Sequence, residues 1–200
     1  MRGVKMSYSK EEIRDLYDAK LDWERVHSII SSPKDSDRFE KSVEILQERV
    51  PWKERILLPL GVHLYLVDKA GQRIVKCDCG HEFGDYRRNW KLSALIFVRD
   101  TREKLEEIYP GVRCPDPNFC EVREFYCPGC GALLKVEAVP LGYPIIFDFL
   151  PNIDAFYRDW LGKPLPTNQE SKDLSQEVFQ AWRAGPIADA PRVIRPGAQH

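Results

Sequence analysis

Two short cysteine motifs decide how this chain folds: CDCGH at residues 77–81 and CPGCG at residues 127–131. In each motif one or two residues separate a pair of cysteines, and a glycine follows the second cysteine. Two thiolates at this spacing can coordinate one metal ion when the chain turns tightly between them. Gly129 and Gly131 allow such a turn. Together the motifs offer the four sulfur ligands of a closed structural zinc site. The predicted zinc ligands are Cys77, Cys79, Cys127 and Cys130.

Other interpretations of these cysteines stay open at this point. Cys127 and Cys130 could form a redox pair, or the thiols could be free and buried. A thioredoxin-like redox site would need a helix after its CxxC motif, whereas the residues after Cys130 have the pattern of a strand. A site of three cysteines and His81 is a further alternative. Cys114 and Cys120 lie in a Pro-rich loop without ligand spacing and are interpreted as bystanders.

The segments around both motifs predict a small antiparallel β unit. Apolar residues alternate along several short runs, and two of these runs flank the second motif as the arms of a hairpin. Asp100 and Glu103 have the spacing to cap a short helix inserted into this unit. The predicted strands are residues 62–67, 73–76, 92–98, 122–126 and 133–139.

Both ends of the chain instead follow the helical period. Ser9 and Glu12 have capping-box spacing, and apolar residues then recur every three or four positions as far as Pro51. A second apolar stripe runs from Ile153 to Leu161, and a third could follow near Leu174. The tail could dock on a partner or pack on its own domain.

The expected architecture is therefore α+β: a small antiparallel, zinc-ribbon-like β module with a helical N-terminal arm and a helical or extended C-terminal arm. The expected division is a helical arm at 1–54, the zinc-binding β module with its helical insertion at 55–150, and a C-terminal helix and Pro-rich tail at 151–200.

The charge balance argues against polyanionic partners. The 200 residues include 30 Lys and Arg and 31 Asp and Glu, so the formal net charge is −1. We therefore expect no binding to nucleic acid or to a membrane surface. No run approaches the ~20 apolar residues of a membrane span, and the N-terminus lacks the apolar middle of a secretory signal. A cytoplasmic location is expected, and there the six cysteines are better explained as metal ligands and free thiols than as disulfides.

No catalytic motif stands in the sequence. Phosphate-binding loops, dinucleotide turns, nucleophile elbows and HExxH motifs are absent from the chain. His27 and His63 are interpreted as packing or surface residues, and no catalytic residue is expected. Aromatic residues instead gather in short, Pro-punctuated segments such as 143–149 and 156–160, as in partner-binding surfaces. These segments could equally fold back on their own core.

Several long strings resemble the γ subunit of acetone carboxylase. They are EILQERVPWKERILLPLG, CDCGHEFGDYRRNWKLSA, VRDTREKLEEIYP, REFYCPGCGALLKVEA and YPIIFDFLPNIDAFYRDWLGKP, and the similarity runs from about residue 8 to residue 166. The resemblance implies a subunit of a heterohexamer with two copies each of α, β and γ chains. Such a complex carboxylates acetone with bicarbonate to acetoacetate and hydrolyses ATP.

In that family the large α and β subunits carry the nucleotide chemistry and a manganese site, while the small subunit carries zinc and no catalytic residue. Its zinc ligands correspond here to Cys77, Cys79, Cys127 and Cys130. One competing interpretation is a γ-type subunit of a related ketone carboxylase, such as acetophenone carboxylase.

Two further interpretations come from other classes of protein. A free-standing zinc ribbon could bind nucleic acid through basic and aromatic residues near the first motif, although acidic residues are interleaved with them. An independent zinc enzyme would need an open metal position, which four cysteine ligands do not leave. The basic and aromatic residues concerned are Lys76, Tyr86, Arg87, Arg88, Trp90 and Lys91.

Overall fold

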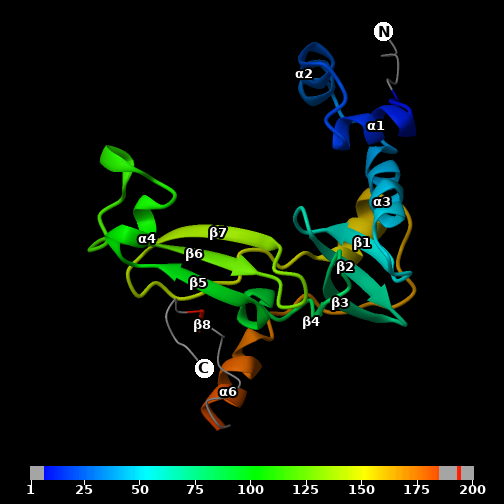
Figure 1. Ribbon diagram of the computed structural model, residues 1–200. Helices are drawn as coiled ribbons and strands as arrows, with labels where there is room; N and C mark the ends of the chain where they lie inside the picture. The colour runs from blue at the N-terminus through cyan, green and yellow to red at the C-terminus, as the bar shows by residue number, and fades with distance from the viewer. Residues whose placement is uncertain (1–6, 185–192, 195–200) are drawn as a thin grey trace.

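The computed structural model describes residues 7–184 and 193–194, and within them the predicted α+β class is confirmed. The chain forms two small sheets rather than one β unit, and Figure 1 shows them side by side. The first sheet has the order β1 (Arg55–Pro59), β2 (Leu64–Lys69), β3 (Gln72–Cys77) and β4 (Glu82–Asp85), all antiparallel. The second has the order β7 (Leu133–Pro140), β6 (Cys120–Tyr126), β5 (Leu95–Arg99) and β8 (Val193–Ile194), and β8 joins β5 in parallel.

The first sheet is built on the hairpin of β2 and β3. Ala70 and Gly71 both have positive φ, 52° and 84°, as a two-residue type I′ turn requires. Strand β2 is apolar on both sides because both faces of the sheet are covered. Tyr65 and Val67 face α3 (Arg38–Arg49), while Leu64 and Leu66 belong to the main core. The sequence predicted β2 and β3, but not the edge strands β1 and β4.

The predicted N-terminal helices are present. Helix α1 (Lys10–Tyr17) begins at the expected cap, where the Ser9 hydroxyl accepts the backbone N–H of Glu12 at 3.1 Å. Helix α2 (Trp23–Ser31) packs with α1 and α3 through a small core of their apolar side chains and Tyr8. Helix α3 stops just before Pro51, as predicted, and its opposite side covers the first sheet.

In the second sheet the predicted hairpin around residues 127–131 is confirmed as β6 and β7. The strand predicted from residue 92 begins later, at Leu95, because η1 (Trp90–Ser93) takes up its first part as a 3₁₀ turn. Asn89 causes this difference, since its side-chain oxygen accepts the N–H of Lys91 at 3.2 Å. The inserted helix α4 (Arg102–Glu106) is capped by Thr101 and not by Asp100, and the short turn η2 (Gly111–Arg113) follows it.

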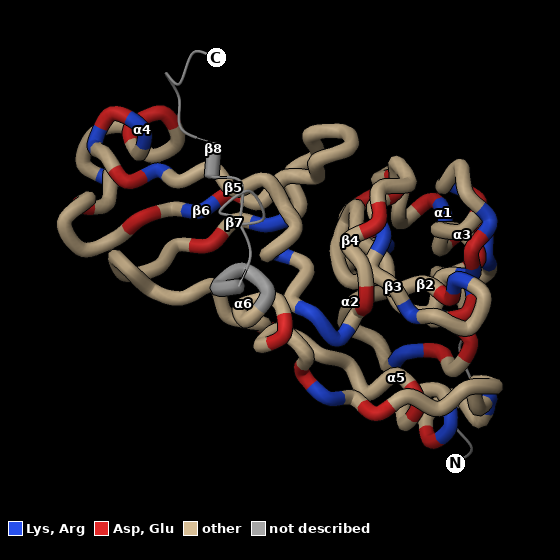
Figure 2. The backbone as a smooth tube through the Cα atoms, turned by 90° about the horizontal axis from the view of Figure 1, so that it is seen from below, with Lys and Arg blue, Asp and Glu red and all other residues tan. Residues whose placement is uncertain are grey.

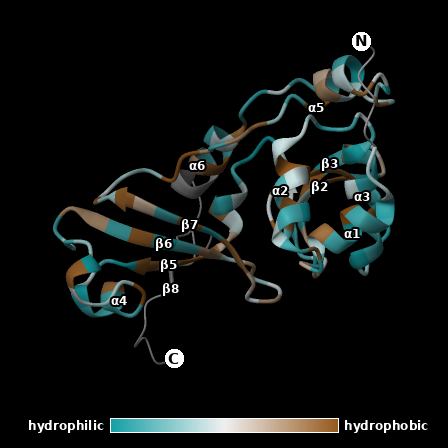
Figure 3. Cartoon of the chain, turned by 90° about the horizontal axis from the view of Figure 1, so that it is seen from above, coloured by the Kyte–Doolittle hydropathy of each residue, from teal (hydrophilic) through white to brown (hydrophobic). Residues whose placement is uncertain are grey.

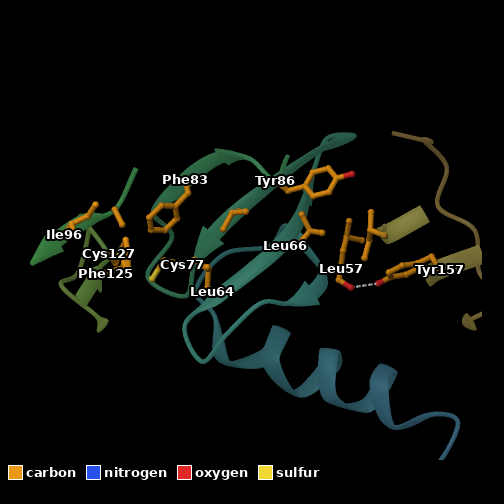
Figure 4. Close-up of a cluster of buried hydrophobic side chains, with 13 residues drawn as sticks. Leu57, Leu64, Leu66, Cys77, Phe83, Tyr86, Ile96, Phe125, Cys127 and Tyr157 are labelled. Atoms are coloured by element: carbon orange, nitrogen blue, oxygen red, sulfur yellow. Dashed lines mark hydrogen bonds between the residues drawn. The ribbon is translucent and has the colours of Figure 1, made fainter. Parts of the chain in front are cut away.

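The C-terminal segment returns from the second sheet to the first. After β7 an extended stretch leads to α5 (Ile153–Ala155), which continues directly as the π-helical turn η3 (Phe156–Trp160). The predicted apolar stripe is therefore helical, but its second half has the wider π spacing. The Tyr157 hydroxyl donates to the backbone carbonyl of Leu57 at 2.9 Å, which fastens this turn to β1 (Figure 4).

The tail packs on its own chain for as far as its contacts are described. The backbone N–H of Leu174 donates to the carbonyl of Arg87 at 2.8 Å, and the Ser175 hydroxyl accepts the N–H of Asn89 at 2.9 Å. Helix α6 (Ser175–Ala184) then begins near the predicted position. Most of the Pro- and Gly-rich end, residues 185–192 and 195–200, lies outside the described residues.

One core of buried side chains runs through both sheets (Figure 4). Figure 3 shows hydrophobic residues in the strands and hydrophilic residues over much of the helical surface. Acidic and basic residues are interspersed along the backbone in Figure 2. Among residues 7–184 and 193–194, no helix has the length and apolarity needed to cross a membrane.

A buried ion pair locks the returning segment onto the first sheet. Both terminal nitrogens of Arg73 in β3 bond the Asp154 carboxylate, at 2.5 and 2.6 Å, and the Arg73 side chain is 1% exposed. We expect Asp154→Ala to lower the free energy of unfolding by about 3–5 kcal/mol, because it leaves the guanidinium buried without its counter-charge. Urea unfolding followed by circular dichroism measures this loss. Asp159→Ala, which removes an exposed carboxylate of the next turn, is the control and should leave the midpoint nearly unchanged.

The same pair predicts an acid dependence. The hydrogen bonds from Arg73 hold the pKa of Asp154 below its usual value. Its stabilising effect is therefore complete above the unfolded-state pKa of about 3.9 and is lost as the pH falls through the lower folded-state pKa. The difference in unfolding free energy between wild type and Asp154→Ala should shrink below about pH 4. A difference that stays constant down to pH 2 would contradict this assignment.

Candidate metal centre

The two cysteine motifs meet where the two sheets adjoin. Cys77 ends β3 and Cys79 follows in the turn to β4, whereas Cys127 and Cys130 lie in the turn between β6 and β7. The four sulfur atoms all lie within 4.8 Å of one another. The cysteines are free thiols, and the contacts between the motifs are 3.9 Å from Cys77 to Cys130 and 3.7 Å from Cys79 to Cys127.

These distances fit a tetrahedral metal ion. With metal–sulfur bonds of about 2.3 Å, a tetrahedral zinc–thiolate centre has sulfur–sulfur edges of about 3.8 Å. A disulfide would instead bring two sulfurs to about 2.05 Å. The four predicted residues are therefore brought together in an arrangement that can hold one metal ion, consistent with a zinc-ribbon-like module.

The backbone of each motif forms a matching tight turn. The N–H of Cys77 donates to the carbonyl of His81 at 2.8 Å, and the N–H of Cys127 donates to the carbonyl of Ala132 at 2.9 Å. The second turn spans one residue more than the first, which accounts for the different spacing of the two cysteine pairs. Each turn passes through a glycine with positive φ, 101° at Gly80 and 72° at Gly131.

Gly129 lets the two turns approach each other. A Cβ at this position would lie 3.0 Å from Cβ of His81 and 3.4 Å from the Cys79 sulfur. The His81 ring packs against Phe83, with their centroids 5.0 Å apart. Among the described residues, the group of converging ligand atoms consists of the four cysteines without His81, so the geometry favours four sulfur ligands over three sulfurs and an imidazole.

Burial divides the four clustered cysteines into two buried and two exposed residues. Cys77 and Cys127 are fully buried, and burial raises the pKa of both thiols. Cys79 and Cys130 are exposed. Burial also acts to raise the pKa of Cys79, but hydrogen bonds from the His81 backbone and the neighbouring thiols outweigh it and lower this pKa. Four thiolates in this setting need a cation to balance their charge.

A second layer of contacts holds the first motif in place. The indole N–H of Trp52 donates to the carbonyls of Cys77 and Asp78, at 3.1 and 3.0 Å. The side chain of Asp78 bonds the His63 ring at 2.5 Å. Such contacts orient metal ligands. The sequence does not reveal these roles of Trp52 and His63, because both residues lie in segments without ligand spacing and reach the motif only in the folded chain.

The remaining cysteines lie elsewhere. Cys114 and Cys120 stand outside the cluster, and each thiol donates to the carbonyl of the following residue, at 3.5 and 3.6 Å. Cys120 is the first residue of β6, so the prediction that it lies in a loop is wrong. Strand β7 follows Cys130 in place of the helix that a thioredoxin-like redox site needs after its CxxC motif, so the structure does not favour a redox pair at Cys127 and Cys130.

The basic residues near the first motif are neutralised within the chain. Lys76 pairs with Glu54 at 2.6 Å, and Lys91 is buried with Glu137 at 2.6 Å. The other two basic residues are paired as well, Arg87 with Asp85 and Arg88 with Glu177. Tyr86 is 2% exposed and is not available for stacking on a base. The geometry therefore does not favour a nucleic-acid surface here.

Comparison with known proteins gives concordant results. The family model described as acetone carboxylase gamma subunit matches residues 50–161. The chain is 48% identical over 168 residues to the acetone carboxylase gamma subunit of Xanthobacter autotrophicus (strain ATCC BAA-1158 / Py2), a match that covers 83% of this chain and 100% of that protein. It is 34% identical over 80 residues to the acetophenone carboxylase beta subunit of Aromatoleum aromaticum (strain DSM 19018 / LMG 30748 / EbN1), covering 39% of this chain and 62% of that protein.

The close contact at Gly129 gives a test of the site geometry. We expect Gly129→Ala to destabilise the protein by about 1–3 kcal/mol and to weaken metal binding, because the added methyl group pushes His81 and the Cys79 sulfur apart. Thermal unfolding and competition with a chromogenic chelator measure the two effects. Gly61→Ala is the control, since its methyl group would meet only Leu64 at 3.9 Å. Equal behaviour of the two variants would contradict the proposed packing of the motifs.

Proposed function

The chain belongs to the acetone carboxylase gamma subunit family, and we propose from this premise that it is the zinc-carrying, non-catalytic subunit of an ATP-dependent ketone carboxylase. The enzyme would join acetone and bicarbonate to give acetoacetate. The identity of 48% along the whole length of the acetone carboxylase relative is the observation that carries this proposal.

The proposed metal is a structural zinc ion held by Cys77, Cys79, Cys127 and Cys130. Two sulfurs come from the first sheet and two from the second, so the ion would join the sheets across their boundary. A structural zinc ion contributes on the order of 10 kcal/mol to the folding of small modules. Four sulfur ligands leave no open position for substrate, which supports a structural role over a catalytic one.

The described titratable residues support the proposal that this chain supplies no catalytic group. Its most buried lysines and arginines pair with carboxylates within the chain. Lys91, which is fully buried, bonds Glu137 and Asp148 at 2.6 and 3.0 Å, and Arg73 is held by Asp154. The nucleotide and manganese chemistry would then belong to larger α and β subunits, with two copies of each chain in the complex.

Exposed apolar side chains support a role in assembly. Trp23, Phe119 and Trp160 are 70%, 76% and 83% exposed. Large aromatic residues are enriched in protein interfaces. They lie at separate parts of the molecule, on α2, at the tip beyond α4 and on η3, which suits a small chain that contacts more than one surface of its partners.

A related ketone carboxylase of the acetophenone type is the second candidate. The similarity to the acetophenone carboxylase beta subunit favours it, but that match covers 80 residues against 168 for the acetone type. The substrate would be bound by the partner subunits, so both enzymes could use a chain with this fold.

Native mass spectrometry of the tagged chain, purified from its own cell after growth on a ketone, tests the proposed function. We expect a complex with two kinds of larger chain and one zinc ion for each copy of this subunit. A monomer or homodimer without larger partners would refute the assignment.

Replacing a ligand tests the structural role of zinc. We expect Cys127→Ser to lose the bound zinc and to unfold at a markedly lower temperature, because both sheets lose their shared ligand set. Cys120→Ser, which changes a cysteine outside the cluster, should keep one zinc ion and a nearly unchanged unfolding temperature. Metal analysis of the two purified variants measures the zinc content, and calorimetry measures the unfolding temperature. Full zinc content in Cys127→Ser would refute the ligand assignment.

A further inference from the structure

A groove of about 320 Å³ runs along the outer side of the first sheet, between α3 and η3. Its floor is apolar, and charged or polar side chains lie along its edges. The floor residues are Phe39, Val43, Ile56, Tyr157 and Leu161, and the residues at the edges are Glu40, Glu44, Gln47, Arg55 and Lys163.

The walls of this groove are fixed by specific contacts. The Phe156 ring of η3 meets Phe39 of α3 edge-on, with their centroids 5.0 Å apart. The Gln47 side chain accepts the backbone N–H of Ile56 at 2.9 Å, which ties α3 to β1. The wall opposite α3 is a π-helical turn, a conformation that is rare and is found frequently at functional sites. The groove is therefore a preformed feature of the fold.

The charges along the groove leave one cation without a counter-charge. Glu40 pairs with Lys163 at 2.5 Å, and Glu44 pairs with Lys10 at 2.7 Å. Arg55 is exposed, and its guanidinium lies over the Tyr157 ring, 5.6 Å from the centroid. Within residues 7–184, no carboxylate is in ion-pair contact with Arg55. An occupant that complements this groove is apolar in its middle and carries a carboxylate at the Arg55 end.

The polar groups of the groove do not suit a small metabolite. Small-molecule sites hold their ligands with several convergent polar groups. Here the Tyr157 hydroxyl is used by the Leu57 carbonyl, and the Gln47 side-chain oxygen is used by Ile56. Arg55 is then the main polar group left to bind an occupant, which fits a protein side chain better than a free ligand.

We propose that this groove is a docking site for a helical segment of one of the larger carboxylase subunits. The segment places an aliphatic or aromatic side chain on the apolar floor and a carboxylate against Arg55, as in other helix-in-groove interfaces. This inference rests on the proposed function as a carboxylase subunit.

Charge reversal at Arg55 tests the inference in the whole complex. Tagged wild type, Arg55→Glu and Arg158→Glu are purified from the native host, and the larger chains retained for each copy of the tagged chain are quantified. Arg158 is the matched control, because it is an exposed arginine of η3 that pairs with Asp159 and does not line the groove. We expect Arg55→Glu to weaken retention at least about tenfold and Arg158→Glu to leave it within about twofold, as for central and peripheral interface residues.

The experiment separates failure of the proposed function from failure of the docking site alone. If wild type itself retains no larger chain, the proposed function fails. If wild type and Arg55→Glu retain the larger chains equally, or if both charge reversals weaken retention to the same degree, only the docking site is refuted. Zinc content and unfolding temperature of Arg55→Glu show whether the variant remains folded.

A photo-crosslinking residue at Val43 identifies the occupant directly. We expect the crosslink to join a peptide of a larger subunit that has a carboxylate within one helical turn of an apolar residue. Replacing that carboxylate by arginine should restore the binding of Arg55→Glu. A crosslink to a second copy of this chain, or the lack of any crosslink in the intact complex, would overturn the proposal.

Discussion

The convergence of four cysteine sulfurs at the boundary between the two sheets is the constraint on which the rest of the structure depends. Neither sheet is large, and the core that they share reaches both pairs of cysteines through the buried Cys77 and Cys127. Two turns of different length present their sulfurs to one point because Gly129 lets them approach within contact distance of each other. A metal ion at this point would fix the orientation of one sheet relative to the other. Hydrophobic burial alone would determine this orientation less strongly.

The returning C-terminal segment reinforces the same boundary from the other side. Its Asp148 meets Lys91 and Lys135 at the second sheet, and its Asp154 meets Arg73 at the first. These buried charges do not by themselves show a large net stabilisation, because desolvation offsets much of their attraction. They do favour one path for the segment, since any other path leaves a buried cation without its partner. The segment thus places η3 against α3 and forms the groove that ends at Arg55.

The fold is compatible with the proposal that this chain serves a carboxylase without supplying catalytic residues. Among the described residues, four cysteines converge on one point, and the basic residues near the first motif are paired with carboxylates. Large exposed aromatic side chains lie on α2, at the tip beyond α4 and on η3. Family membership and geometry therefore support the same proposal, in which the chain acts by shape and contact within a carboxylase.

The sequence by itself determined the α+β class, the two helical arms, the hairpin around residues 127–131 and the four cysteines that converge, because each leaves a local signal of period, cap or spacing. Only the tertiary structure decided that there are two sheets, that β1 and β4 form the edges of the first sheet, and that Trp52 and His63 support the first cysteine motif. It also decided the π-helical turn and the pairing of Arg73 with Asp154. These features depend on contacts between residues that are far apart in the chain, and such contacts leave no periodic trace in the sequence.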